Sequence, residues 1–184
     1  LVTGVQTCAL PISAVGATTQ VFGTITMTAD TGGTSTLNIT GADPVTIGAF
    51  TGTTIDASGM TAQAAGTTTF NMGTAATTVT TITGSPGDDT LAGDAASTIN
   101  GGAGADTITG GSGNDTLNGG DGNDNITTGA GTDTVNAGAG NDTIVLGDNL
   151  SALDAIDGGA GTDTLSVTDT GLNALQALNI SQAN

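Results

Sequence analysis

The 184-residue sequence has no lysine, arginine or histidine, and its 17 acidic residues are all aspartate, which gives a net charge of −17. A chain without positively charged side chains is a poor partner for nucleic acid or for an anionic membrane surface. Without histidine, lysine or glutamate it also lacks the usual general bases, so we expect no enzyme active site within it. Zinc and copper sites are disfavoured because the chain offers no imidazole and one cysteine.

Aromatic residues and long apolar runs are also scarce. Phe, Trp and Tyr make up 2% of the chain, and no apolar run approaches the roughly 20 residues that span a bilayer, so we expect no transmembrane segment. The one cysteine, Cys8, lies in a stretch, Val2–Ile12, that resembles the conceptual translation of a common sequencing adapter. We interpret residues 1–12 as an adapter artefact and expect the genuine chain to be a piece of a longer protein.

What the chain does contain is a nine-residue repeat between Gly84 and Val145, with the pattern Gly-Gly-x-Gly-x-Asp-x-apolar-x. We number these positions one to nine, so that the aspartate is position six and the apolar residue is position eight. Eight units are visible and seven have the aspartate; the unit 93–100 is one residue short and lacks it, and the unit 158–166 follows an insertion at 146–157. Position eight keeps its phase at Leu91, Ile99, Ile108, Leu117, Ile126, Val135 and Ile144.

A fixed period of this kind predicts an all-β solenoid, in which neighbouring units stack to bury their apolar side chains. Positions seven to nine should form a short strand whose middle side chain points inward. The glycines should form a turn that needs positive φ values, and Asn114, Asn123 and Asn141 suit the same turn because asparagine tolerates the left-handed region. Two units would make one coil, so turns of alternate units would stack about 4.8 Å apart.

Stacked turns would place the aspartates in two columns, where unneutralised carboxylates repel each other. A hard divalent cation, completed by backbone carbonyls that the glycines expose, would remove this repulsion. Calcium is favoured over magnesium, which demands near-octahedral geometry. The predicted metal ligands are Asp89, Asp106, Asp124 and Asp142 in one column, and Asp115, Asp133 and Asp163 in the other.

Neighbours in these columns predict about four to five calcium sites. Four lie between regular units, and a fifth, between Asp133 and Asp163, depends on whether the insertion at 146–157 bulges out of the stack as a loop. The short unit 93–100 should leave its position without a full site. The four regular pairs are 89/106, 106/124, 124/142 and 115/133.

The segment 84–166 resembles the RTX repeats. Units such as Gly110-Gly-Ser-Gly-Asn-Asp-Thr-Leu-Asn118 carry this resemblance. The resemblance implies a right-handed parallel β-roll with calcium in its turns. It also implies an extracellular protein that a type I secretion system exports unfolded and that external calcium folds.

The flanks have no such repeat. Residues 13–83 are rich in Thr, Ala and Gly, with short alternating stretches that predict an irregular β-helix leading into the roll, or a small sandwich. The run Thr54–Met60 loosely resembles repeat regions of alphaproteobacterial S-layer proteins and large RTX adhesins. Residues 167–184 end in a short helix or in a capping strand that finishes at Ile180. The expected flank strands are 21–28, 36–40, 45–47, 54–57, 68–72 and 77–83.

Three functions fit these features. The leading hypothesis is a calcium-binding structural segment of a secreted cell-surface protein, S-layer or adhesin-like, with self-assembly or a cell-surface polysaccharide as candidate partners. The alternative is the export and folding module of an RTX protease or lipase, whose catalytic domain lies outside this chain. A third hypothesis is an ice-binding solenoid, although the Thr runs do not repeat at a solenoid period.

A disordered Gly/Asp-rich linker is the alternative to any of these folds. One apolar side chain per nine residues buries too little surface to offset the entropy of ordering the chain. We therefore expect the calcium-free chain to be disordered and folding to be coupled to metal binding.

Overall fold

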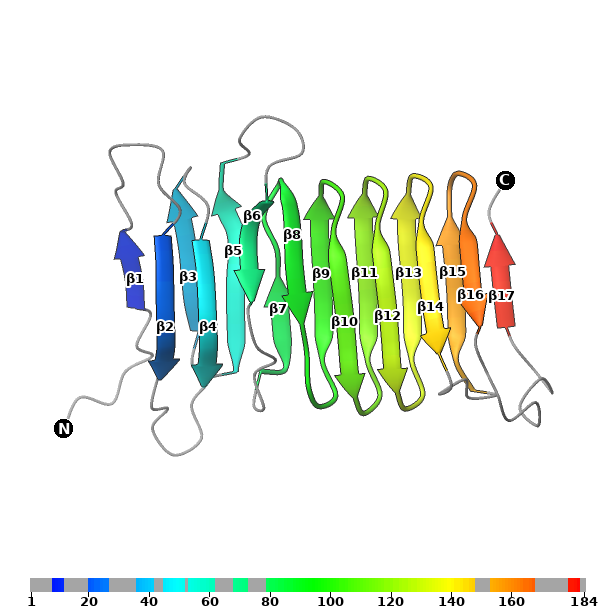
Figure 1. The fold of residues 1–184 in the computed structure, drawn as a ribbon, viewed down its shortest axis with the longest axis horizontal. Coiled ribbons are helices and arrows are strands. Elements are labelled where there is room, and N and C mark those ends of the chain that lie inside the picture. The colour runs from blue at the N-terminus through cyan, green and yellow to red at the C-terminus, as the bar shows by residue number, and fades with distance from the viewer. Residues whose placement is uncertain are drawn as a thin grey trace.

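The computed structural model of the protein describes residues 8–11, 20–26, 36–41, 45–51, 53–61, 68–72, 79–147, 153–167 and 179–182. The described elements are all strands, and every pairing between them is parallel. Successive strands alternate between two sheets, one of nine strands and one of eight. Figure 1 shows the strands side by side along the long axis of the molecule, from β1 to β17.

The nine-stranded sheet contains the odd-numbered strands: β1 (Cys8–Pro11), β3 (Thr36–Gly41), β5 (Thr54–Met60), β7 (Thr81–Thr83), β9 (Thr98–Ala103), β11 (Thr116–Asp121), β13 (Thr134–Ala139), β15 (Ala155–Gly159) and β17 (Asn179–Gln182). The eight-stranded sheet contains the even-numbered strands: β2 (Gln20–Thr26), β4 (Val45–Thr51), β6 (Thr68–Met72), β8 (Asp88–Ala92), β10 (Thr107–Ser112), β12 (Asn125–Ala130), β14 (Thr143–Gly147) and β16 (Thr164–Val167). This arrangement is a β-solenoid, as the repeat predicted.

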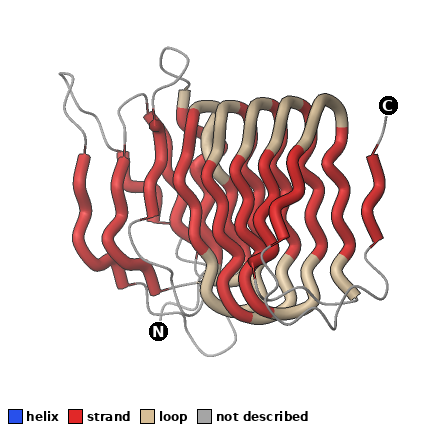
Figure 2. The backbone as a smooth tube through the Cα atoms, turned by 45° about the vertical axis from the view of Figure 1, so that its right-hand side comes forward, coloured by secondary structure: helices blue, strands red, loops and turns tan. Residues whose placement is uncertain are grey.

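The register confirms that two repeat units make one coil. Ile108 of β10 lies opposite Ile126 of β12, and Leu117 of β11 lies opposite Val135 of β13. Because each pair is two units apart in the sequence, equivalent positions stack on one another along each sheet. Figure 2 shows the result as successive coils whose turns line both edges of the stack.

The core is the space between the two sheets, and position eight of every unit points into it. The column in the nine-stranded sheet runs in register through Leu37, Ile55, Ile82, Ile99, Leu117, Val135 and Ile156, all buried. The column in the other sheet runs through Leu91, Ile108, Ile126 and Ile144, all buried, and ends at the partly buried Leu165. Burial of each side chain stabilises the stack by about 1.5–3 kcal/mol.

The flank before the repeats belongs to the same solenoid. Ile55 of β5 lies opposite Ile82 of β7, which lies opposite Ile99 of the repeat region. The prediction of a β-helix leading into the roll is therefore confirmed, and the sandwich alternative is wrong. The strand β1 lies within the residues interpreted as adapter sequence, so we give it no functional role.

At the other end, β17 extends the nine-stranded sheet by pairing with β15. Of the two predictions for the C-terminal flank, a capping strand is therefore observed at 179–182, although it extends past Ile180. The helix alternative was predicted for residues that lie mostly outside the described part of the chain.

In six of the units, positions two and four are glycines with positive φ values. Gly120 and Gly122, for example, have φ values of 122° and 133°, in the region that disfavours a residue with a Cβ atom. A Cβ atom at Gly122 would also overlap the carbonyl of Gly104 in the preceding coil. These glycines therefore allow both the tight turn and the close stacking of one coil on the next.

Candidate metal-binding turns

Position six of the repeat is buried even though it is an aspartate. Along each unit the inward positions are six, eight and one, because side chains alternate across a strand. Six of the seven predicted ligands are 1–2% exposed, and Asp163 is half-buried. The fully buried ones are Asp89, Asp106, Asp115, Asp124, Asp133 and Asp142.

One carboxylate oxygen of each aspartate links its coil to the preceding one. The backbone N–H of Asp106 donates to Oδ1 of Asp124 at 2.8 Å, and the N–H of Asp124 donates to Oδ1 of Asp142 at 2.8 Å. Asp89 donates in the same way to Asp106, and Asp142 donates to Asp163. The first column is therefore a continuous ladder from Asp89 to Asp163.

The second column is formed on the opposite edge of the stack. The N–H of Asp115 donates to Oδ1 of Asp133 at 2.9 Å, and the N–H of Asp133 donates to Oδ1 of Asp154 at 2.8 Å. The prediction that Asp163 follows Asp133 in this column is wrong, since Asp163 stacks on Asp142. Asp154, which sequence reasoning missed, takes that place and is buried.

The segment 146–157, interpreted from the sequence as an insertion, is largely a ninth unit of the stack. Leu146 is buried at position one, and Asp154 and Ile156 occupy positions six and eight, with Ile156 opposite Val135. Only residues 148–152 of this segment lie outside the described residues. The Asp154-Ala-Ile156 pattern was the available signal, and three extra residues in the unit concealed it.

Serine side chains stand at the N-terminal end of both columns. In the short unit 93–100, Ser97 occupies position six and donates its N–H to Oδ1 of Asp115 at 2.7 Å. Its hydroxyl lies 2.7 Å from the carbonyl of Ala95 and 3.3 Å from that of Val79. In the first column the N–H and hydroxyl of Ser85 both donate to the Asp89 carboxylate. Asp89 is therefore already partnered within its own turn.

A second ladder on the outside of the turns runs in the opposite direction. Oδ1 of Asn123, at position five, accepts the N–H of Asn141 in the following coil at 2.7 Å. Asn114 and Asn141 do the same for Thr132 and Thr162. From the sequence we predicted only a backbone role for these asparagines. This inter-coil hydrogen bond was not predicted.

The second carboxylate oxygen is the unusual feature of the site. Oδ2 of Asp106, Asp115, Asp124, Asp142 and Asp163 is buried and has no hydrogen-bond partner. Buried polar atoms are normally satisfied, so five such oxygens in equivalent places indicate an absent positive partner. A divalent cation that prefers oxygen ligands fits this requirement.

The pKa values of these carboxyl groups lead to the same conclusion. Burial raises the pKa of Asp106 to about 8, and the neighbouring Asp89 and Asp124 contribute in the same direction. Burial also raises the pKa of Asp115 and of Asp124 to about 6. The N–H from the preceding coil offsets part of each increase. The charged form is therefore destabilised in the folded chain unless a cation or a proton neutralises it.

Carboxylates alone do not complete a coordination sphere. No group of three or more acidic or cysteine side chains converges on one point within the described residues. A bound calcium ion, which takes six to eight oxygens, would have to use backbone carbonyls of the turns as well.

A parallel β-solenoid with buried carboxylates in its stacked turns has the architecture of a calcium-binding β-roll. Comparison with family models identifies the RTX calcium-binding nonapeptide repeat in four copies, at residues 80–97, 92–126, 118–149 and 154–166. The chain therefore contains RTX repeats, and calcium, the ion they bind, is supported as the ligand.

The other comparisons add no relative. Neither the curated proteins nor the solved structures give a match to this chain. In the described part of the chain, no helix is long and apolar enough to cross a membrane.

Proposed function

We propose that residues 84–166 form a calcium-binding structural segment of a secreted cell-surface protein, S-layer or adhesin-like, that folds when it meets calcium outside the cell. The observation that carries this proposal is the set of buried, unpartnered Oδ2 atoms in the turns. The proposed ligands are the position-six aspartates predicted from the sequence, Asp89, Asp106, Asp115, Asp124, Asp133, Asp142 and Asp163, joined by Asp154.

In this proposal the chain's own residues position the oxygen ligands, and the ion supplies the positive charge that neutralises them. The N–H of each preceding aspartate fixes Oδ1, which leaves Oδ2 directed into the turn. Glycines at positions two and four let carbonyl groups approach the next coil closely. Bound calcium would neutralise the carboxylates that burial has made costly to ionise.

Calcium-coupled folding follows from comparing the two states of the chain. In the unfolded chain the aspartates are hydrated and their charges lie far apart. Folding buries them in two columns, and this cost opposes the gain from the apolar core. Extracellular calcium modules commonly bind at about 0.1–1 mM, so a segment of this kind would fold after export.

A structural role is supported by the continuity of the stack. The apolar column runs without interruption from Leu37 in the flank to Ile156 in the last coils. The described flank is thus part of the same solenoid. For the alternative, an RTX enzyme, the discriminating observation is a catalytic motif in the sequence upstream of this chain.

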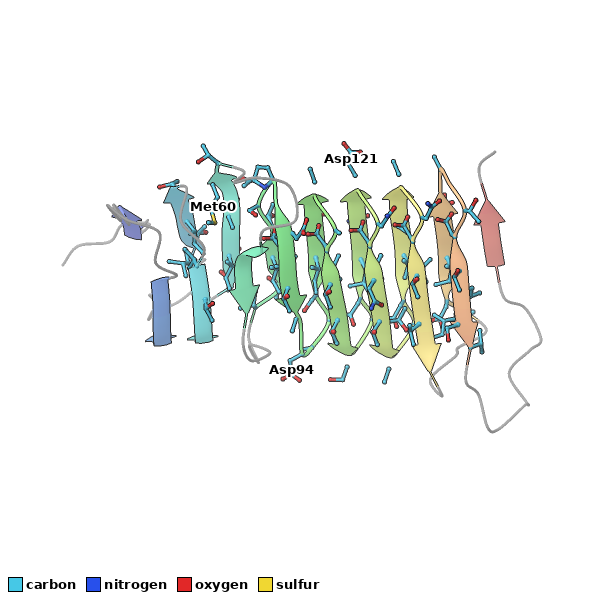
Figure 3. The ribbon with its side chains drawn as sticks, turned by 45° about the horizontal axis from the view of Figure 1, so that its top comes forward. Met60, Asp94 and Asp121 are labelled. Atoms are coloured by element: carbon cyan, nitrogen blue, oxygen red, sulfur yellow. The ribbon has the colours of Figure 1, made fainter. Side chains whose placement is uncertain are left out.

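The experiment that tests the proposal removes two carboxylates of one column. In the full chain, Asp106→Ala with Asp124→Ala should raise the calcium midpoint of folding at least fivefold, measured by far-UV circular dichroism. The matched control is Asp94→Ala with Asp121→Ala, which removes the same charge from residues that lie at the outer ends of the turns (Figure 3). Equal midpoints in the two double variants would contradict the proposed sites.

A further inference from the structure

The turns differ from one another at position one, which faces the position-six aspartate across the interior of the turn. Position one is buried in every described unit. A Cβ atom there would lie against Oδ2 of the position-six aspartate, as at Gly101 with Asp106 and at Gly119 with Asp124. Most units have glycine there, but three have a side chain: Thr128, Ala137 and Leu146, all 0–1% exposed.

Glycine at position one is not required by the backbone. Gly101, Gly110 and Gly119 are not among the residues with positive φ, so alanine or threonine could adopt the same backbone conformation. What glycine provides is space. A Cβ atom at Gly110 would lie 2.7 Å from Oδ2 of Asp115 and would overlap the carbonyl of Thr128 in the following coil.

The same two kinds of oxygen atom surround this space at Gly84, Gly101, Gly110 and Gly119. At Gly101 they are Oδ2 of Asp106 and the carbonyl oxygen of Gly119; at Gly119 they are Oδ2 of Asp124 and the carbonyl oxygen of Ala137. A buried carboxylate oxygen without a partner and a backbone carbonyl therefore converge on one small volume. Two acceptors that converge without a donor form a site for a cation.

Every aspartate that has a buried Oδ2 without a partner lies opposite a small residue at position one. Asp106, Asp115, Asp124 and Asp163 face glycine, Asp142 faces alanine, and each has a buried Oδ2 without a partner. The repeat places Thr128 opposite Asp133 and Leu146 opposite Asp154, so in these two turns a buried side chain takes up the space that glycine leaves open elsewhere. The one exception opposite glycine is Asp89, whose carboxylate accepts hydrogen bonds from Ser85.

From this difference in space we infer that the residue at position one determines which turns of this chain bind calcium tightly. Small residues leave the turns of Asp106, Asp115, Asp124, Asp142 and Asp163 open. Thr128 and Leu146 fill the turns of Asp133 and Asp154, so these aspartates hold calcium weakly. The tight sites are therefore concentrated in the first column, and the second column has one. This inference rests on the proposed function, because it ranks the sites of that function.

Gly110 and Thr128 allow a reciprocal test, because they are position-one residues of neighbouring coils in the second column. The double variant Gly110→Thr with Thr128→Gly keeps the composition of the chain and exchanges the open and closed turns. Equilibrium dialysis with calcium-45 would count the tight ions in the full chain. We expect the parent and the exchanged chain to bind equal numbers, but at different aspartates.

Asparagine substitutions then locate the second-column site. In the parent, Asp115→Asn should remove one tight ion and Asp133→Asn should remove none. In the exchanged chain, Asp133→Asn should remove one and Asp115→Asn none. An unchanged dependence on Asp115 in the exchanged chain would overturn the inference.

The single variant Thr128→Gly separates this role from packing. It deletes a buried side chain, so a purely structural role predicts that more calcium is needed for folding. The inference predicts one additional tight ion. If the parent binds no calcium, the proposed function fails; if it binds calcium but none of these variants changes the number or place of tight ions, only the inference fails.

Discussion

The backbone N–H of Asp106 donates to Oδ1 of Asp124 at 2.8 Å, while Oδ2 of Asp124 is buried without a partner. One oxygen of the carboxylate is thus used to align two coils, and the other is left for a ligand. This division is repeated along the column, and it explains how a carboxylate can be both a structural element and a metal ligand.

The pH dependence of the calcium-free chain follows from the raised pKa values. A carboxyl group whose folded pKa exceeds its unfolded value binds protons more strongly in the folded state, so it favours folding at low pH. This contribution is complete below the unfolded value of 3.8 and is lost as the pH rises through the folded values, about 6 for Asp115 and Asp124 and about 8 for Asp106. We expect β-structure in the presence of a chelator to increase as the pH falls from 8 to 5. An increase towards alkaline pH would contradict this.

Neutral isosteres should reduce the need for calcium. Asp106→Asn with Asp124→Asn keeps an oxygen that can accept the inter-coil N–H but removes the buried charge. We expect more β-structure without calcium than in the parent, and about two fewer bound ions. Circular dichroism in chelator and equilibrium dialysis measure the two effects. If the asparagine variant is as disordered without calcium as the parent, burial of charge is not what opposes folding.

The apolar column should be sensitive to cavities. Ile126 is fully buried between Ile108 and Ile144, so Ile126→Ala should destabilise the calcium-loaded fold by about 2–5 kcal/mol. Urea unfolding in saturating calcium would measure this loss. The control is Thr109→Ala on the exposed face of the neighbouring strand β10, for which we expect a change within about 0.5 kcal/mol.

The outer asparagine ladder should contribute modestly to the stability of the fold, and its contribution should not depend on calcium. Asn123→Ala removes the acceptor of the Asn141 N–H, and we expect a loss of about 0.5–1.5 kcal/mol. The effect should be the same at every calcium concentration that saturates the sites. Asn136→Ala, at an exposed position of β13, is the matched control for the same substitution. Equal losses in the two variants would show that the ladder adds nothing.

The regular part of the fold could be predicted because each unit repeats the same local rule. With a nine-residue period and an apolar residue at position eight, the coils can stack in register in only one way. The observed pairing from Leu91 to Ile144 has this register. The flank strands were also predictable within a few residues from alternation. That they continue the same stack is shown by the observed pairings, such as that of Ile55 with Ile82.

The features that could not be predicted lie mainly where the nine-residue period is interrupted. Three extra residues before Asp154 shifted the apparent phase, so Asp163 was placed in the wrong column. The partners of Asp89 were missed for a different reason: Ser85 replaces a glycine at position two, and only the folded turn brings its hydroxyl to the carboxylate. Likewise, the effect of Thr128 depends on which side chain faces it across the turn.

Calcium is expected to fold this chain. Far-UV circular dichroism of the full chain, during a calcium titration that begins in chelator, tests this most directly. Circular dichroism is the suitable probe because the chain has no Trp or Tyr. We expect a transition from coil to β-structure at roughly 0.1–1 mM calcium and none with the same concentration of magnesium. A spectrum that stays disordered in several millimolar calcium, or that shows full β-structure in chelator at neutral pH, would contradict it.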